Sequence, residues 1–287
     1  MYQKQISFII FCVLFVGTAF SQSSVWKVSK NGNTLYLGGS VHLLRAEDYP
    51  LPTEFDKAFK KSDILILEAD IAQLANPEVA QKMMTQAMLH GEETLQTVLD
   101  EETFKLLKAK CAELSIPLEN LMKFKPAMVA TVLTVVKMQQ LGFTLQGVDA
   151  HYYAKAAEKN MDIDFLETVD FQINMLLNMG VGFENEFIKY EIDDLDNIDT
   201  DIDKLILDWR NGTSEYISSM QIEMKKTFPT VYKSMFTDRE NEWLPKIEKY
   251  LTDKPVEFIV VGLAHLQGDD GLLAQLKNKG YTVKQLK

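Results

Sequence analysis

Residues 24–42 read SVWKVSKNGNTLYLGGSVH. In this stretch apolar and polar side chains alternate on both sides of Asn31-Gly32, a pattern typical of strands with one buried face. The Asn-Gly pair readily adopts the positive φ angles of a tight turn between antiparallel strands. The stretch therefore predicts a β-hairpin that leads the chain directly into Gly39-Ser40-Val41-His42.

Further strands are expected along the chain. The continuous apolar run at 64–67 is typical of a strand that helices cover on both faces. Predicted strands at 144–148, with Asp149 capping the next helix, and at 163–166 each precede a helical stretch, and this alternation favours parallel pairing. The last strands are expected at 256–261 and 281–283. We therefore predict an α/β fold with a mixed, largely parallel central sheet flanked by helices.

The remaining segments have helical patterns. We expect a short helix at 54–61, two long helices at 76–89 and 101–114, a helix at 271–279, and a buried core helix at 126–141, which is apolar almost all round. Residues 184–208 are strongly acidic, and residues 202–251 have a helical pattern. We interpret 184–251 as a helical insert or lid over the sheet, within a single domain at 22–287.

One acidic stretch has the spacing of a cation-binding loop. Asp199-x-Asp201-x-Asp203 matches the first ligands of a calcium loop, but Lys204 and Arg210 stand where that loop needs Gly and Glu. A solvated acidic face is the better interpretation.

Residues 1–21 are interpreted as a signal peptide. Lys4 precedes an apolar run at 6–20, and Ala19-Phe20-Ser21 provides small residues for cleavage before Gln22. The alternative is a retained membrane anchor, but the run is shorter than the about 20 residues that a spanning helix needs. We therefore expect an exported protein, periplasmic or extracellular, without a stable membrane anchor after cleavage.

The net charge and the cysteine content argue against nucleic-acid binding, anionic membranes as partners and disulfide bonds. The formal net charge is −11, which disfavours nucleic acid or an anionic membrane surface as the main partner. Cys111 is the only cysteine after residue 21, so no intrachain disulfide is expected. Its helical setting, without a nearby His, favours a structural thiol over a nucleophile. The sequence leaves the oligomeric state open.

Two histidines occupy equivalent local positions. Gly39-Ser40-Val41-His42 and Gly262-Leu263-Ala264-His265 each follow a predicted strand, and Glu68 and Glu167 each follow an apolar one. Ligands of open α/β sheets bind beyond the carboxyl ends of the strands, so we expect these four side chains to converge. We also expect each glycine to let the chain turn sharply.

Imidazole and carboxylate together suit a divalent first-row metal with an open position for water. Such a metal activates the water and polarises a carbonyl, a free carboxylate can act as base, and an Arg beyond the metal can hold the oxyanion. The alternative is that both histidines are structural. A cap at a helix end is the expectation for His90, and His151 is left open between a structural and a site role.

The chain resembles the TraB/PrgY/GumN family, which is related to the Tiki proteases. The resemblance is carried, in order along the mature chain, by Val25–Val28, Leu35–His42, Tyr49–Pro52, Leu65–Glu68, Lys125-Pro126, Gly147–Asp149, Phe165–Thr168 with Gln172, Asp238–Asn241 and Gly262–Leu272. Ser40 stands where the family commonly has Thr, a change that keeps the hydroxyl.

The resemblance implies a fold similar to erythromycin esterase and the haem-binding ChaN proteins. It implies that His42 and His265 are metal ligands and that Glu68 is the carboxylate partner or base. It also marks Glu167, Arg239 and Asn241 as recurrent polar positions.

From these features we expect an exported metal-dependent hydrolase that uses Mn, Co, Zn or Fe. A peptidase is the leading prediction, with a peptide or protein as substrate. The alternatives are a non-catalytic protein that sequesters a peptide and a protein that binds haem or iron.

Overall fold

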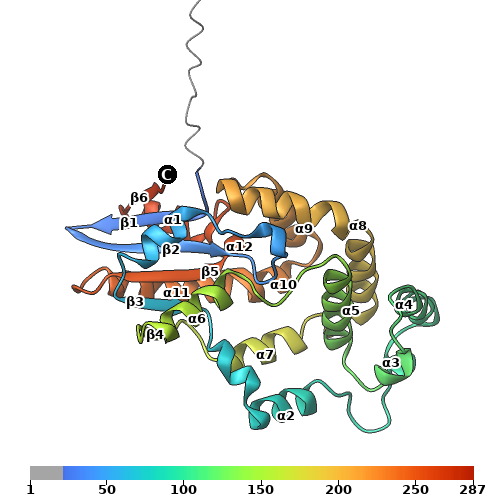
Figure 1. The fold of residues 1–287 in the computed structure, drawn as a ribbon. Helices are drawn as coiled ribbons and strands as arrows, with labels where there is room; N and C mark the ends of the chain where they lie inside the picture. Colours follow the sequence, from blue (N-terminus) through green and yellow to red (C-terminus); the bar gives the residue numbers. More distant parts are fainter. Residues whose placement is uncertain (1–21) are drawn as a thin grey trace, which may run out of the picture.

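The fold is built on a six-stranded sheet in the order β4-β3-β5-β2-β1-β6, as Figure 1 shows for the computed structural model, which describes residues 22–287. The predicted signal peptide lies outside the described residues. The strands are β1 (Val25–Lys30), β2 (Asn33–Ser40), β3 (Ile64–Leu67), β4 (Asp162–Phe165), β5 (Glu257–Gly262) and β6 (Thr282–Gln285).

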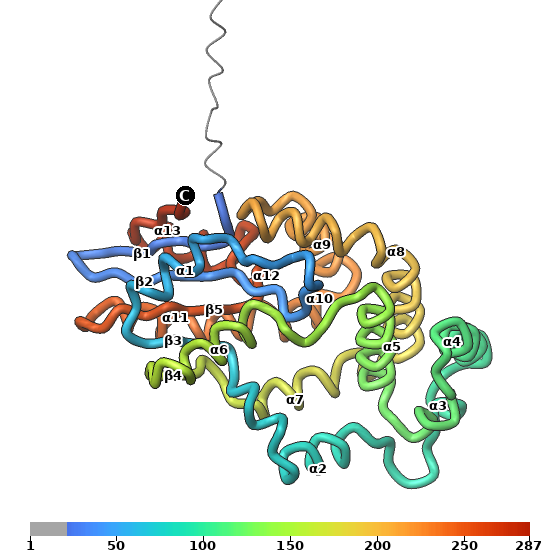
Figure 2. Tube along the Cα trace, in the orientation of Figure 1, coloured from blue at the N-terminus to red at the C-terminus, as the bar shows by residue number. Residues whose placement is uncertain are grey.

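Strand directions confirm the predicted hairpin and the largely parallel sheet. β1 pairs antiparallel with both β2 and β6, whereas β2–β5, β5–β3 and β3–β4 are parallel pairs. Figure 2 shows the two ends of the chain interleaved, with β5 beside β2 and β6 beside β1. Because β2, β5 and β3 run in the same direction, the residues that follow them meet at one edge of the sheet.

Helices surround this sheet and extend away from it. The α-helices are α1 (Thr53–Phe59), α2 (Pro77–Gln86), α3 (Leu95–Val98), α4 (Glu101–Glu113), α5 (Pro126–Gln140), α6 (Val148–Glu158), α7 (Val169–Leu177), α8 (Glu184–Asn211), α9 (Glu215–Thr227), α10 (Pro229–Tyr232), α11 (Asp238–Tyr250), α12 (Leu263–Leu266) and α13 (Leu272–Asn278). Short 3₁₀ turns are η1 (Ala46–Asp48), η2 (Ile71–Ala75) and η3 (Leu118–Asn120), and η4 (Lys233–Thr237) is one turn of π-helix.

The expected strand at 144–148 is wrong. Thr144 forms only an isolated antiparallel bridge with Leu44, after which the chain turns into α6. The segment passes beside the backbone that leaves β2, where the Val148 N–H donates to the Val41 carbonyl at 3.1 Å. The expected cap is also different, because Gly147 is the N-cap of α6 and Asp149 lies in its first turn.

The expected core helix is only partly buried. α5 buries one face, with Val129 and Leu133 fully covered, in a second hydrophobic cluster shared with α4 and α8. Val132 and Val136 pack against the same cluster but are only half-buried. Figure 1 shows α5 beside α8, with α3 and α4 away from the sheet, whereas α2 contacts α7 and η2.

A buried tryptophan connects the helical segment at 184–251 to the sheet. Trp209, near the end of α8, is fully buried, and its indole N–H donates to the Gly39 carbonyl at 2.9 Å. The Ser24 hydroxyl donates to the Trp209 carbonyl at 2.6 Å. The helical segment is therefore fixed to β2 close to His42. Within residues 22–287, none of the helices has both the length and the apolar character needed to cross a bilayer.

Glu257 is a buried carboxyl group at the amino end of β5, the end opposite to the one where His42 and Glu68 lie. It begins β5, is 1% exposed, and its Oε2 atom has no hydrogen-bond partner. Burial, together with the charges of Asp253 and Asp63, raises the pKa of Glu257 to about 7. The folded state therefore favours the protonated form more than the unfolded state does.

This burial predicts a pH-dependent loss of stability. A carboxyl group whose pKa is raised by folding stabilises the folded state fully below its pKa in the unfolded chain, 4.5. This stabilisation is lost as the pH rises through 7. The free energy of unfolding of the wild type should therefore fall by on the order of 2–3 kcal/mol between pH 4.5 and pH 8. Glu257→Gln, which stays neutral, should lack this decrease. Urea unfolding at both pH values measures this, with Glu92→Gln as the exposed control. Equal pH dependence in wild type and Glu257→Gln would refute it.

Candidate active site

Side chains that follow three neighbouring parallel strands meet at Gly262. His42 lies two residues after β2, Glu68 follows β3 directly, and Gly262 ends β5. A Cβ atom at Gly262 would lie 3.3 Å from Glu68 Oε1, 3.6 Å from His265 Cδ2 and 3.7 Å from His42 Nε2. The structure therefore brings His42, Glu68 and His265 together, as the sequence predicts.

The two motif glycines provide space instead of a sharp turn. Gly39 lies inside β2, where a Cβ would come within 2.5 Å of the Leu263 side chain. Gly262 has φ −48° and ψ 133°, angles that any residue adopts. The expectation of a turn is thus wrong at both positions. Glycine is needed at position 39 because β2 and the α12 turn pack closely, whereas at position 262 a Cβ would be tight only against Glu68 Oε1.

Arg239 lies at the centre of this cluster and is 5% exposed. It is the second residue of α11, just after the π-helical turn η4, a feature frequent at functional sites. Its Nε donates to Glu167 Oε2 (3.1 Å), Nη2 to Glu167 Oε1 (2.7 Å) and Glu68 Oε2 (2.5 Å), and Nη1 to His265 Nε2 (2.9 Å) and the Met235 carbonyl (3.3 Å).

These contacts use all five N–H donors that a guanidinium has. Arg239 therefore has no donor left for an oxyanion in this arrangement, contrary to the role expected for an Arg at the site. It holds Glu68 and Glu167 in place instead. Although burial opposes ionisation, the charge of Arg239 lowers the pKa of Glu68 to about 2, and a 2.6 Å hydrogen bond from the Gly262 N–H to Oε1 acts in the same direction.

The contact with Arg239 also fixes the protonation of His265. Arginine is always protonated, so His265 Nε2 must accept the hydrogen bond from Nη1. The proton of the neutral ring is then on Nδ1, which donates to Glu240 Oε1 at 3.1 Å. Burial lowers the pKa of His265 to about 3 and raises that of Glu240 to about 8. His265 is therefore a neutral, fully engaged ring.

His42 differs from His265 in its exposure and in its hydrogen bonds. Its Nδ1 lies 3.2 Å from Asp149 Oδ1, which also accepts a hydrogen bond from the Ser40 hydroxyl at 2.7 Å. The side chain is 59% exposed, and its Nε2 faces the space above Gly262. Although burial by surrounding atoms opposes protonation, Asp149 and then Glu68 raise the pKa of His42.

Gly147 explains why Asp149 reaches His42. A Cβ at Gly147 would lie 2.3 Å from the His42 carbonyl oxygen, so only glycine lets the start of α6 pass this close. Asp149, two residues later, is thereby placed beside the ring. Asp149 was not among the predicted site residues, because its position near an expected helix start suggested a cap. A polar first-turn residue next to a glycine in a family motif was the available signal.

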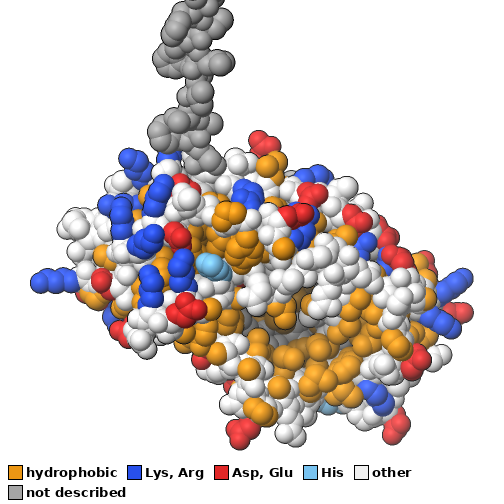
Figure 3. Space-filling model, in the orientation of Figure 1, with side chains coloured by type: hydrophobic (Ala, Val, Ile, Leu, Met, Phe, Trp, Pro, Cys, Tyr) orange, Lys and Arg blue, Asp and Glu red, His pale blue; other side chains and the backbone are white. Residues whose placement is uncertain are grey.

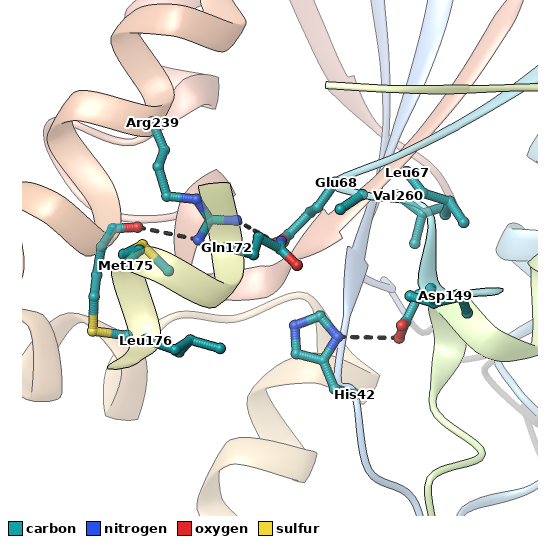
Figure 4. Close-up of a pocket in the computed structure, with 12 residues that line it drawn as sticks. His42, Leu67, Glu68, Asp149, Gln172, Met175, Leu176, Arg239 and Val260 are labelled. Carbon is teal, nitrogen blue, oxygen red and sulfur yellow. Dashed lines mark hydrogen bonds and ion pairs between the residues drawn. The ribbon is translucent and has the colours of Figure 1, made fainter. Parts of the chain in front are cut away.

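A cavity of about 310 Å³ opens at this cluster. Figure 4 shows His42 and Asp149 on one side and Glu68, Gln172 and Arg239 on the other, with Met175 and Leu176 of α7 beside them. Gln172 donates to Glu68 Oε2 at 3.0 Å. The remaining lining residues are Leu67, Ala69, Ile71, Met235 and Val260. The volume is at the lower end of ligand pockets.

The arrangement does not offer a ready set of metal ligands. A metal between His42, His265 and Glu68 needs lone pairs of these groups, but His265 Nε2 and Glu68 Oε2 both accept from Arg239. Within residues 22–287 no group of three or more His, Cys, Asp or Glu side chains is placed to hold a metal ion. A divalent ion bound to His265 would require the guanidinium to withdraw, so the metal stays a prediction.

Other residues considered from the sequence lie away from the cavity. Asn241 is exposed, two positions along α11 from Arg239 and so on a different face of the helix. The His151 ring packs against Tyr49 and Tyr152. α2 ends at Gln86, so His90 is not its cap. Burial raises the pKa of Cys111 to about 11, consistent with a structural thiol.

Comparison with known proteins identifies relatives over nearly the whole described chain. The model of the TraB/PrgY/gumN family matches residues 24–285. The protein called "Uncharacterized protein YbaP" in Escherichia coli (strain K12) is 26% identical over 248 residues, which cover 84% of this chain and 87% of that protein. The protein of the same name in Shigella flexneri gives the same values. No solved structure matches this chain.

Arg239 should be needed for stability as well as for the site. Arg239→Met leaves two buried carboxylates without their cation, and breaking a buried ion pair in this way costs about 3–5 kcal/mol. Urea unfolding measures this cost. Lys233→Met removes an exposed ion pair with Asp238 from the same helical region and should cost less than about 1 kcal/mol. Similar losses in both variants would contradict the central role of Arg239.

Proposed function

The chain belongs to the TraB/PrgY/gumN family, and on that premise we propose that it is a hydrolase of amide or ester bonds, with peptides as its leading substrates. The observation that carries the proposal is the His42–Asp149 pair, whose free Nε2 faces Glu68 across Gly262 at the carboxyl edge of the sheet. An imidazole held at one nitrogen and open at the other is suited to proton transfer.

The proposed reaction uses a water molecule above Gly262. His42 must be neutral for this step, and because its pKa is raised, the neutral ring becomes more populated as the pH rises. In that form Nδ1 donates to Asp149, so Nε2 is free to accept a proton from the water as its oxygen attacks the substrate carbonyl carbon. The imidazolium that forms is stabilised by Asp149 and Glu68, which raise the pKa of His42. It then gives the same proton to the leaving nitrogen or oxygen as the carbonyl carbon releases it.

The other polar residues position these groups. Ser40 and Asp149 hold the ring of His42, while Arg239 and Gln172 hold the carboxylate of Glu68. Glu167 is not part of the cavity lining and acts through Arg239. This scheme needs no divalent ion, because each step is assigned to a side chain whose contacts are in place.

The apolar run at 6–20 supports export, so we propose that the protein works in the periplasm or outside the cell. Binding of a peptide without cleavage is the second candidate function, which the apolar wall formed by Met175, Leu176 and Met235 favours.

Proton transfer by His42 predicts a large loss of hydrolysis in two variants. With a pool of fluorogenic peptides as substrate, His42→Ala and Asp149→Asn should each lower kcat/KM by about 10²–10⁴-fold. His151→Ala is the matched control, since it removes a histidine of the same helix as Asp149 that lies outside the cavity. Circular dichroism confirms folding of each variant.

Treatment with a chelator tests, in the same assay, whether hydrolysis depends on a divalent metal. Unchanged activity after dialysis against EDTA is expected from the contacts of Arg239. Loss of activity that Mn, Co, Zn or Fe restores would replace the proposed mechanism by a metal-dependent one. Peptide binding without cleavage by the wild-type protein would refute the hydrolase and favour the second candidate function.

A further inference from the structure

One wall of the cavity that contains His42 is apolar and is lined by side chains that can adopt several rotamers. Met175, Leu176 and Met235 face the polar groups of the site, and Figure 4 shows the first two next to Gln172 on α7. Methionine is unbranched and has three rotatable side-chain bonds, so it adapts to apolar groups of different shapes. None of these three side chains has a part in the proposed proton transfer.

A second cavity of about 440 Å³ continues from Met175. It lies between α7 and the segment from α10 to α11, and it shares Met175 with the first cavity. Its lining combines apolar side chains, among them Phe171, Val181 and Val231, with the carboxamides of Asn174 and Asn178. We call the two cavities together the α7 groove.

Several apolar side chains of the α7 groove are open to solvent. Phe171 is 44% exposed, Leu176 39% and Val181 60%. Figure 3 shows hydrophobic side chains gathered around a hollow on the side of the molecule where α5 and α7 lie in Figure 1. An exposed apolar surface that surrounds a hollow is typical of a binding site.

We propose that the α7 groove binds an extended polypeptide, with a large apolar side chain beside the reacting bond in the first cavity and a neighbouring apolar side chain in the second. The proposal rests on the proposed function and adds its substrate preference. Continuity supports it, because Met175 lines both the cavity that contains His42 and Glu68 and the one beyond it.

The carboxamides distinguish a polypeptide from a lipid acyl chain. Asn174 and Asn178 lie one helical turn apart among the apolar residues of the second cavity. Asn178 Nδ2 already donates to the Asn174 backbone carbonyl at 2.7 Å, which leaves Asn178 Oδ1 and the Asn174 carboxamide to face the cavity. These groups can accept from and donate to the N–H and C=O groups of an extended backbone. An acyl chain would leave such groups without partners, which is unfavourable when water is displaced.

The test separates binding from cleavage. A fluorescein-labelled peptide of eight residues with two central leucines is titrated against Asp149→Asn protein, which should leave it intact, and compared with the same peptide carrying two central aspartates. Fluorescence anisotropy gives both Kd values. We expect the leucine peptide to bind at least tenfold more tightly, because burial of apolar side chains drives the contact.

Two added substitutions then locate the binding surface. Leu176→Asp and Phe171→Asp alter side chains that are already partly exposed, so folding should survive, and each should raise the Kd of the leucine peptide at least tenfold. Leu207→Asp is the matched control, since Leu207 is 61% exposed on α8 and lines neither cavity. Equal effects of all three substitutions would overturn the proposal.

The outcomes are distinct from those of the hydrolase test. Displacement of the peptide by a dodecanoyl probe that binds more tightly would overturn the proposal in favour of a lipid. Cleavage by the wild-type protein with kcat/KM unchanged in Leu176→Asp and Phe171→Asp would overturn the groove and keep the hydrolase. Peptide binding that both variants weaken, without cleavage by the wild type, would keep the groove and refute the hydrolase.

Discussion

The buried guanidinium of Arg239 is the contact on which the site depends. It joins α11 to the ends of β3 and β4 through Glu68 and Glu167 and to α12 through His265, so four elements far apart in sequence are fixed by one side chain. Two carboxylates and a guanidinium are stable in a nearly dry site only when each charge has a partner and each donor an acceptor. Here all five guanidinium donors have acceptors.

This arrangement makes the two motif histidines unequal. His265 is buried and neutral, and both of its nitrogens have partners. His42 is anchored at one nitrogen by Asp149 and is open to the cavity at the other. Sequence spacing alone presents the two residues as a symmetric pair, which favours a shared metal. Their different surroundings favour a division of roles instead, in which His265 supports the cluster and His42 contacts substrate or water.

Local patterns predict much of the fold and part of the site. The hairpin around Asn31-Gly32 and the apolar run at 64–67 are decided by neighbouring residues, and both are strands as predicted. The expected strand at 144–148 fails because contact with the backbone after β2, and not its own pattern, determines its path. The partner of His42 was missed for the same reason, since Asp149 reaches the ring only through the close approach of Gly147 to the His42 carbonyl. Asn241 shares a sequence motif with Arg239 but lies on a different face of α11.

The exposed apolar side chains of α7 lie beside the charged centre of the site. α7 packs Val169, Ile173 and Leu177 in a hydrophobic cluster with Ala69 and Ala87, whereas its Phe171 and Leu176 remain exposed. Leaving apolar surface beside a charged centre costs solvation free energy and stabilises nothing in the chain alone. A partner that covers this surface recovers that free energy, and it does so next to His42. α7 thus provides the apolar side of the site, while Arg239 organises its polar side.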